Sequence, residues 1–287
     1  MTAIFKKEFK SYFINMSGYV FIAFILLFAG IFTTALNLKT GYASFSYSLS
    51  NMTMVFLFAV PILTMRSLAE ERHARTDQLL YSLPLKVSDI VLGKYFAMLV
   101  VFLLPTLVMC LYPILLTAFG TVQFSTAYGA ILAFFLLGAA LIAICMFMSS
   151  LTESQIIAAV LSFGVLLAAY LMKGIASLIP STAIASFLCL LAVAAIAALI
   201  VWLLTKNYVI AIAALALCVF PLCLVYFLNA SVFEGLFAEL ISTLSLFDRF
   251  NSFVYGMFDV TAIVYYLSII VFFLFLSVQS VEKRRWS

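Results

Sequence analysis

Eight apolar runs recur from one end of this 287-residue chain to the other. They lie near residues 18–36, 46–65, 95–119, 126–149, 155–172, 182–204, 209–228 and 261–281. A helix needs about 20 apolar residues to cross a hydrocarbon core about 30 Å thick. Only 9% of the residues are charged, against about a quarter in soluble globular proteins. The pattern predicts an all-α, polytopic helical membrane protein with about eight transmembrane helices, forming one transmembrane domain over residues 1–287.

The basic residues predict how these spans are oriented. Eight spans place both termini on one side, and that side holds twelve Lys and Arg residues, against three on the other, Lys39, Lys173 and Arg249. The positive-inside rule therefore predicts that both termini are cytoplasmic. The two runs within 182–228 are separated by only four residues. The alternative, in which one of them is re-entrant, would place the basic C-terminus outside, against the rule.

The predicted spans contain no Asp, Glu, Lys, Arg or His. Ionisable groups within the membrane typically mark proton relays and ion sites, so this absence argues against a proton-coupled carrier or an ion pump. Gly93-Lys94 resembles the end of a phosphate-binding loop, but Ser88 stands where that loop needs glycine. The five cysteines lie in apolar runs without a nearby histidine. We therefore expect no catalytic residue, cofactor-binding residue or metal site in this chain.

One long hydrophilic interruption, residues 66–94, holds nine of the 26 acidic and basic residues and the only histidine. It reads as a helix from Arg66 to Leu83, ended by Pro84, after which Ser88 or Asp89 caps a second helix. Thr76, Leu79, Leu80 and Leu83 follow the i, i+3, i+4, i+7 spacing of an apolar helix face. We interpret the segment as a cytosolic elbow.

The charge of this elbow indicates what it contacts. Five basic residues face four acidic ones, whereas a helix that binds the membrane surface is normally richer in Lys and Arg. A nearly neutral helix with an apolar face favours a groove on a protein partner. The alternative is an amphipathic loop that lies on lipid headgroups.

The N-terminal residues 1–17 have a different pattern. Aromatic and aliphatic residues alternate with Lys6, Lys7 and Lys10 at helical spacing. This predicts a basic amphipathic helix that lies along the inner leaflet and contacts membrane lipid.

Two polar or amphipathic segments are expected on the outer side. Residues 229–260 carry an apolar stripe that predicts a re-entrant or interfacial helix. The alternatives are an aromatic anchoring belt, a dock for an extracytoplasmic partner, or an outer gate with the candidates Phe233, Leu236, Phe237 and Leu240. The polar stretch from Tyr42 to Asn51 suggests that the outer half of the second span faces a cavity.

Several sequence blocks carry a resemblance to a known family. They are Phe5 to Phe13 (FKKEFKSYF), Ser17-Gly18-Tyr19, Pro61 to Glu71 (PILTMRSLAEE), then Thr76, Leu79-Leu80 and Pro84, then Ile90 to Tyr95 (IVLGKY), Ser149 to Gln155 (SSLTESQ) and Asp259 to Ser268. With these blocks the chain resembles an ABC-2 type permease of ABC transporters, and most closely the gliding-motility (GldF-like) group. The resemblance covers roughly 1–172 and 240–287. It departs at 182–228, because the family core has six spans.

The resemblance implies a permease subunit of an ATP-driven exporter in the cytoplasmic membrane of a bacterium. It would form a homodimer or pair with a related permease. Two copies of a separate ABC ATPase would bind ATP and Mg²⁺ and dock on the elbow. The implied coupling residues are Arg66, Glu70, Glu71, Arg72, Arg75, Thr76, Leu79, Leu80 and Leu83. We expect no nucleic-acid partner. The alternative is a non-transporting scaffold or a mechanotransmitting subunit that anchors a cytosolic partner.

Overall fold

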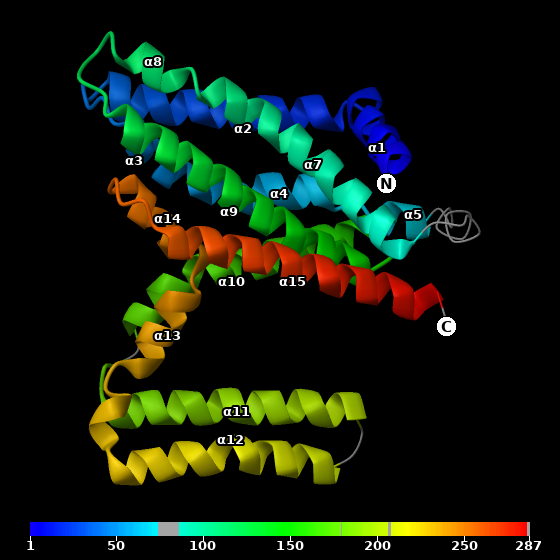
Figure 1. The fold of residues 1–287 in the computed structure, drawn as a ribbon, viewed down its shortest axis with the longest axis vertical. Coiled ribbons are helices and arrows are strands. Elements are labelled where there is room, and N and C mark those ends of the chain that lie inside the picture. Colours follow the sequence, from blue (N-terminus) through cyan, green and yellow to red (C-terminus); the bar gives the residue numbers. More distant parts are fainter. Residues whose placement is uncertain (74–85, 179, 206–207, 286–287) are drawn as a thin grey trace. The chain divides into compact units, whose positions relative to one another are not determined.

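The computed structural model describes residues 1–73, 86–178, 180–205 and 208–285, and every regular element within these ranges is helical (Figure 1). The prediction of an all-α chain is confirmed. The chain divides into two compact units, Met1–Tyr170 with Arg249–Ser287, and Leu171–Asp248. Helices α10 (Gln155–Leu178) and α14 (Leu246–Val254) each contain residues of both units.

The first unit holds most of the chain. Its helices are α1 (Thr2–Ile14), α2 (Ser17–Thr33), the π-helical turn η1 (Thr34–Leu38), α3 (Phe45–Met52), the 3₁₀ turn η2 (Thr53–Val55), α4 (Phe56–Thr64), α5 (Ala69–His73), α7 (Val87–Met109), α8 (Tyr112–Leu116), α9 (Phe124–Leu151) and α15 (Val260–Arg285). The third predicted span is broken into α7 and α8. Pro113 lies at the start of α8, where its missing N–H leaves no helical hydrogen bond unmade.

Six helical segments in the described residues are long and apolar enough to cross a membrane. They are Ser17–Leu38, Phe45–His73, Val87–Leu116, Phe124–Leu151, Gln155–Met172 and Val260–Arg284. A sharply bent pair, Leu215–Tyr226 with Ser231–Leu244, would raise the number to seven. These six match six of the eight predicted spans, and the chain is a multi-pass membrane protein. The runs at 182–204 and 209–228 are helical, and their crossing of the membrane stays a prediction.

Helix α9 is the centre of the first unit and packs against α3, α4, α7 and α15. Its Phe134 lies in a cluster of buried rings, 4.5 Å from Phe56 and 6.2 Å from Phe102 between ring centroids. Gly138 lies one turn further along α9, where an added Cβ would be 2.4 Å from the Phe102 ring. A hydrogen at this position is therefore what lets α7 and α9 approach closely.

The second unit is a pair of adjacent helices with a short cap. α11 (Ala183–Thr205) packs against α12 (Tyr208–Leu228), and η3 (Ala230–Phe233) and α13 (Leu236–Leu244) follow. Phe187 of α11, Tyr226 of α12 and Phe233 of η3 form one ring cluster with centroids 4.5–5.8 Å apart. These aromatic contacts hold η3 against both helices.

The close approach at Gly138 predicts a stability difference between two glycines of the same helix. We expect Gly138→Ala to destabilise the chain by about 1–3 kcal/mol, because the new methyl group meets the Phe102 ring. At Gly129 an added Cβ meets nothing within 4 Å, so Gly129→Ala should be neutral or stabilising by up to about 1 kcal/mol. Thermal unfolding of the purified variants in detergent measures both, and equal melting temperatures would contradict the close approach.

Candidate functional site

The described ends of the predicted elbow lie at the same end of the first unit as α1 (Figure 1). Helix α4 ends at Thr64, a turn leads into the short helix α5, and α7 begins at Val87. The residues predicted to carry the apolar face, with Arg75 and Pro84, lie outside the described ranges, so the apolar face stays a prediction. The predicted capping of the second helix was wrong. Lys86 precedes α7 without a side-chain cap, and Asp89 lies in the first turn, where a carboxylate interacts favourably with the helix dipole.

A buried ammonium group lies where these elements meet. The side chain of Lys94, on α7, is only 2% exposed. Its Nζ atom lies 2.9 Å from Glu71 Oε1 and 3.2 Å from Glu8 Oε1, and donates a hydrogen bond to Ser67 O at 2.8 Å. An ammonium group has three donors, and three acceptors surround it. Lys94 therefore connects α7 to α1, to α5 and to the turn before α5.

Lys7 lies at the exposed edge of the contacts around Lys94 and binds the same two glutamates. Its Nζ atom lies 3.3 Å from Glu71 Oε1 and 3.5 Å from Glu8 Oε1. Partial burial lowers the pKa of Lys7, but attraction to Glu71 and Glu8 outweighs this, so the pKa is raised above its ordinary value. Two lysines thus neutralise two glutamates, as buried charges require. We call Lys7, Glu8, Glu71 and Lys94 the inner charge cluster.

The C-terminal end of α9 holds the turn before α5. Ser149 Oγ accepts hydrogen bonds from the backbone N–H groups of Leu68 at 3.3 Å and Ala69 at 3.2 Å. The same hydroxyl donates to Met65 O at 3.4 Å. Backbone groups at helix ends have no partner inside the helix and need one elsewhere. Ser149 supplies that partner, and so connects the end of α9 to the start of the elbow.

Helix α1 is attached directly to its neighbours. The Tyr12 hydroxyl donates to Leu63 O near the end of α4 at 3.3 Å, and burial raises the pKa of this hydroxyl. Ile4 packs on α7 at Gly93, where an added Cβ would lie 3.0 Å from Ile4 Cγ2. The glycine before Lys94 therefore brings α1 close enough for Glu8 to reach the ammonium group.

The remaining described elbow residues lie around this cluster. Arg66 and Glu70 form an ion pair of 3.7 Å between two exposed side chains, which is worth little in stability. Arg72 is buried at 9% exposure. Of the predicted coupling residues that lie within the described ranges, only Glu71 belongs to the inner charge cluster. Within the described ranges, no three His, Cys, Asp or Glu side chains are close enough to hold a metal ion.

Lys7, Glu8, Lys94 and Ser149 were not recognised from the sequence as members of one site. A signal was present, because they lie in three different blocks of the family resemblance. These blocks are FKKEFKSYF, IVLGKY and SSLTESQ, and Glu71 lies in a fourth, PILTMRSLAEE. The structure brings four blocks that are distant in sequence to the same end of the first unit.

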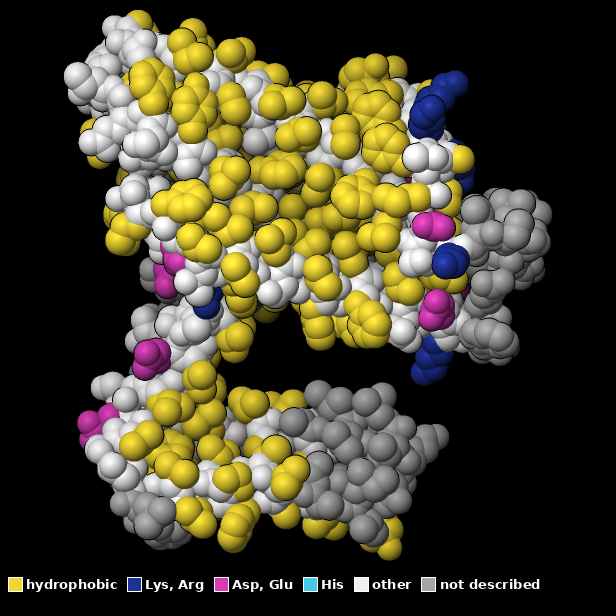
Figure 2. Space-filling view, viewed as in Figure 1, with side chains coloured by type: hydrophobic (Ala, Val, Ile, Leu, Met, Phe, Trp, Pro, Cys, Tyr) yellow, Lys and Arg dark blue, Asp and Glu magenta, His cyan; other side chains and the backbone are white. Residues whose placement is uncertain are grey.

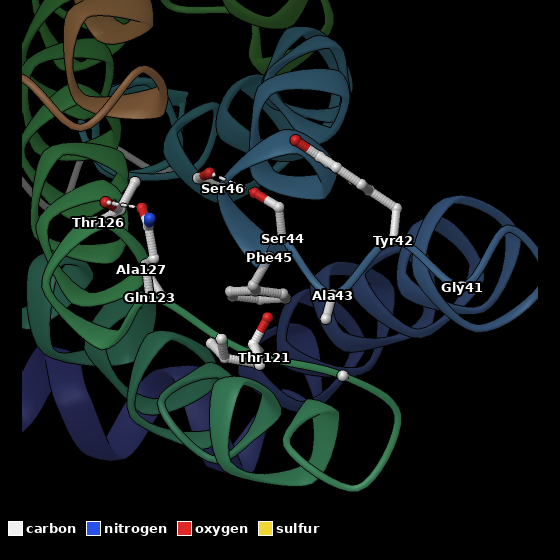
Figure 3. Close-up of a pocket in the computed structure, with 12 residues that line it drawn as sticks. Gly41, Tyr42, Ala43, Ser44, Phe45, Ser46, Thr121, Gln123, Thr126 and Ala127 are labelled. Atoms are coloured by element: carbon white, nitrogen blue, oxygen red, sulfur yellow. Dashed lines mark hydrogen bonds between the residues drawn. The ribbon is translucent and has the colours of Figure 1, made fainter.

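The opposite end of the first unit carries a polar cavity of about 430 Å³ (Figure 3). It lies between the loop before α3 and the loop before α9, and its lining includes Tyr42, Ser44, Ser46, Gln123 and Thr126. The prediction of a cavity beside the polar half of the second span is thus confirmed for Tyr42, Ser44 and Ser46. Its lining has hydroxyl and amide groups but no ionised side chain, which suits neutral polar groups rather than ions.

The outer-gate candidates separate into two places in the second unit. Phe233 is 3% exposed and belongs to the ring cluster with Phe187 and Tyr226. Leu236, Phe237 and Leu240 lie on α13, and Leu240 is exposed. Phe233 therefore has a packing role in this structure, and a gate at these residues stays a prediction.

A comparison with known families decides what kind of protein carries this inner site. The model of the ABC-2 family transporter proteins matches residues 3–213. The chain belongs to this family. It is the permease component of an ABC transporter, a class that works with a separate ABC ATPase. The match runs through α11 to residue 213, so the departure expected at 182–228 was wrong for residues 182–213. The resemblance expected over 240–287 lies outside the match and stays a prediction. No curated protein and no solved structure matches the chain.

The contact between α9 and the elbow predicts a difference between two neighbouring serines of this ABC-2 protein. We expect Ser149→Ala to destabilise the chain by about 1–3 kcal/mol, because two buried N–H groups lose their acceptor. Ser150 is equally buried, and its hydroxyl makes no hydrogen bond within the described residues, so Ser150→Ala should cost nothing. Melting temperatures in detergent compare the two. A loss at Ser150 as large as at Ser149 would refute the assigned role.

Proposed function

We propose that this chain is the permease subunit of an ATP-driven exporter, and that a separate ABC ATPase docks on the elbow at 66–94. ATP and Mg²⁺ bind to that ATPase. Movement of the docked ATPase displaces the elbow, and the elbow displaces the inner ends of the spans. The chain itself carries no catalytic group in this scheme.

The observation that carries the proposal is the attachment of the elbow to several helices at once. On its first side, Glu71 binds Lys94 and Lys7, while Ser149 holds the preceding turn. At its second end, the elbow includes the first turns of α7, where Lys94 lies. A displacement of the elbow therefore acts on α1, α7 and α9 together. Packed networks of this kind carry energetic coupling between distant sites.

The location of the charges supports an external source of energy. Among the described residues of the six candidate spans, the buried charged side chains are Lys94 and Arg72, and both lie near the inner ends of their segments. Lys94 is surrounded by acceptors. The polar cavity at the opposite end has no ionised lining. Neither feature offers the proton relay or ion site that a gradient-driven carrier requires.

The family also supports the assembly that we propose. ABC-2 permeases act with ATPase subunits, and we infer two ATPase copies bound to two permeases, either a homodimer or a pair of related chains. The end that carries the N-terminus and the C-terminal end of α15 (Figure 1) faces the cytoplasm by the positive-inside rule. We place the complex in the inner membrane of a bacterium, and the gliding-motility group as its nearest functional class.

The docking proposal is tested by co-purification and by ATP hydrolysis. We expect Leu79→Asp with Leu80→Asp to lower ATPase binding and to abolish the stimulation of hydrolysis by the permease, because charges replace the predicted apolar face. Leu178→Asp is the control, since Leu178 is 82% exposed and is predicted to lie on the outer side.

The two variants separate docking from general damage. Normal binding and normal stimulation with the elbow variant would refute the docking site. Normal binding and stimulation without transport by the wild type would favour the mechanotransmitting alternative.

A further inference from the structure

Helix α1 presents one of its faces to the protein. Ile4, Glu8 and Tyr12 are spaced four residues apart, so they lie on the same side of the helix. Ile4 packs at Gly93, Glu8 binds Lys94, and Tyr12 bonds to Leu63. These contacts fix α1 as one rigid body against α7 and α4.

A second face of α1 is a row of aromatic rings. The centroids of Phe5 and Phe9 lie 6.0 Å apart, and those of Phe9 and Phe13 lie 5.0 Å apart. The row continues to Tyr19 of α2 at 5.1 Å, and Tyr19 is 58% exposed at the start of the first candidate span. The aromatic row is therefore continuous with the surface that the first span presents to lipid.

Lys6 and Lys10 form the edge of α1 beside this row. They are one turn apart, and both are exposed. Within the described ranges neither forms an ion pair with an acidic side chain, in contrast to Lys7 one residue away. Figure 2 shows Lys and Arg side chains gathered at the α1 end of the first unit, beside a broad apolar surface. Two unpaired cations next to an apolar row complement an anionic headgroup above acyl chains.

We propose that α1 binds anionic phospholipids of the inner leaflet through Lys6 and Lys10, and that this binding positions Glu8 against Lys94. Two observations favour a lipid as the ligand of this face. Within the described residues, Lys6 and Lys10 carry unpaired positive charge, and the aromatic row is continuous with the first span. Lipid bound to Lys6 and Lys10 positions Glu8 because these three residues belong to one helix of 13 residues. The lipid thereby regulates the elbow, a step that rests on the proposed function, whereas the binding itself does not.

The binding step is tested with the purified full chain in mixed micelles. Phosphatidylglycerol is added to a phosphatidylcholine background, and the concentration for half of the melting-temperature shift is measured. We expect Lys6→Gln with Lys10→Gln to raise this concentration by about 25-fold, since each cation near an anionic surface contributes a factor of about five. Lys283→Gln with Arg285→Gln removes the same charge at the C-terminus and should stay near the wild-type value.

Three results overturn the binding step. The first is an equal loss in both variants, which would show a general effect of net charge. The second is an equal shift with soluble glycerol 1-phosphate, which would show binding of phosphate without the leaflet. The third is unchanged lipid binding with lost ATPase co-purification in the Lys6→Gln, Lys10→Gln variant, which would assign this edge to a protein partner.

The regulatory step is tested on the complex with its ATPase in nanodiscs. We expect phosphatidylglycerol to stimulate hydrolysis in the wild type, and Glu8→Gln to keep the lipid affinity while losing the stimulation. Stimulation that survives in Glu8→Gln would overturn the role of Glu8. If hydrolysis never responds to the permease, the proposed function fails, and the lipid affinity measured on the isolated chain still decides the binding step.

Discussion

The ammonium group of Lys94 is the constraint on which the inner end of this protein depends. A charge with 2% exposure is costly unless partners surround it. Its partners come from α1 and from the turn and helix that follow α4, so the charge can be buried only when these elements are assembled. Replacing such a cluster with apolar groups is often neutral for stability. We infer that its value here is to specify one arrangement of otherwise apolar helices.

The same cluster would explain how an apolar bundle could respond to the cytosolic partner that we propose. The core of the first unit is largely apolar and includes the ring cluster of Phe56, Phe102 and Phe134, and the burial of apolar surface is non-directional. The inner charge cluster and Ser149 instead make specific bonds to the start of the elbow. In the proposed mechanism, force applied at the elbow would reach three helices through these polar bonds, while the apolar core would keep those helices packed.

Much of the fold follows from the sequence, because apolar runs of span length leave few choices other than helices. The elbow at 66–94 was inferred because its charges interrupt those runs, and it stays a prediction. The inner charge cluster was not predicted, because Glu8 and Lys94 are 86 residues apart and neither residue type nor spacing reveals a tertiary contact. Lys94 lies at the boundary of a predicted span, where a lysine normally extends to water. Gly93 is what makes burial possible, and its role depends on α1 packing there.

Other limits of prediction have similar physical causes. A gate at Phe233 stays a prediction, because an apolar stripe looks the same in sequence whether it faces a pathway or packs on neighbours. The structure packs the Phe233 ring against Phe187 and Tyr226. The start of α7 was assigned to a Ser or Asp cap, but Lys86 occupies that position. Hydrogen-bonding residues near a helix start do not fix its first residue to better than a few positions.

The central claim is that Lys94 and Glu71 act as one unit that connects the elbow to the spans. A double-mutant cycle with Lys94→Met and Glu71→Gln, read as stimulation of ATP hydrolysis in the complex, tests it most directly. Each single variant should lose most of the stimulation, and the double variant should lose little more than either one, with an interaction energy of at least about 1 kcal/mol. Losses that add within about 0.5 kcal/mol would contradict the claim.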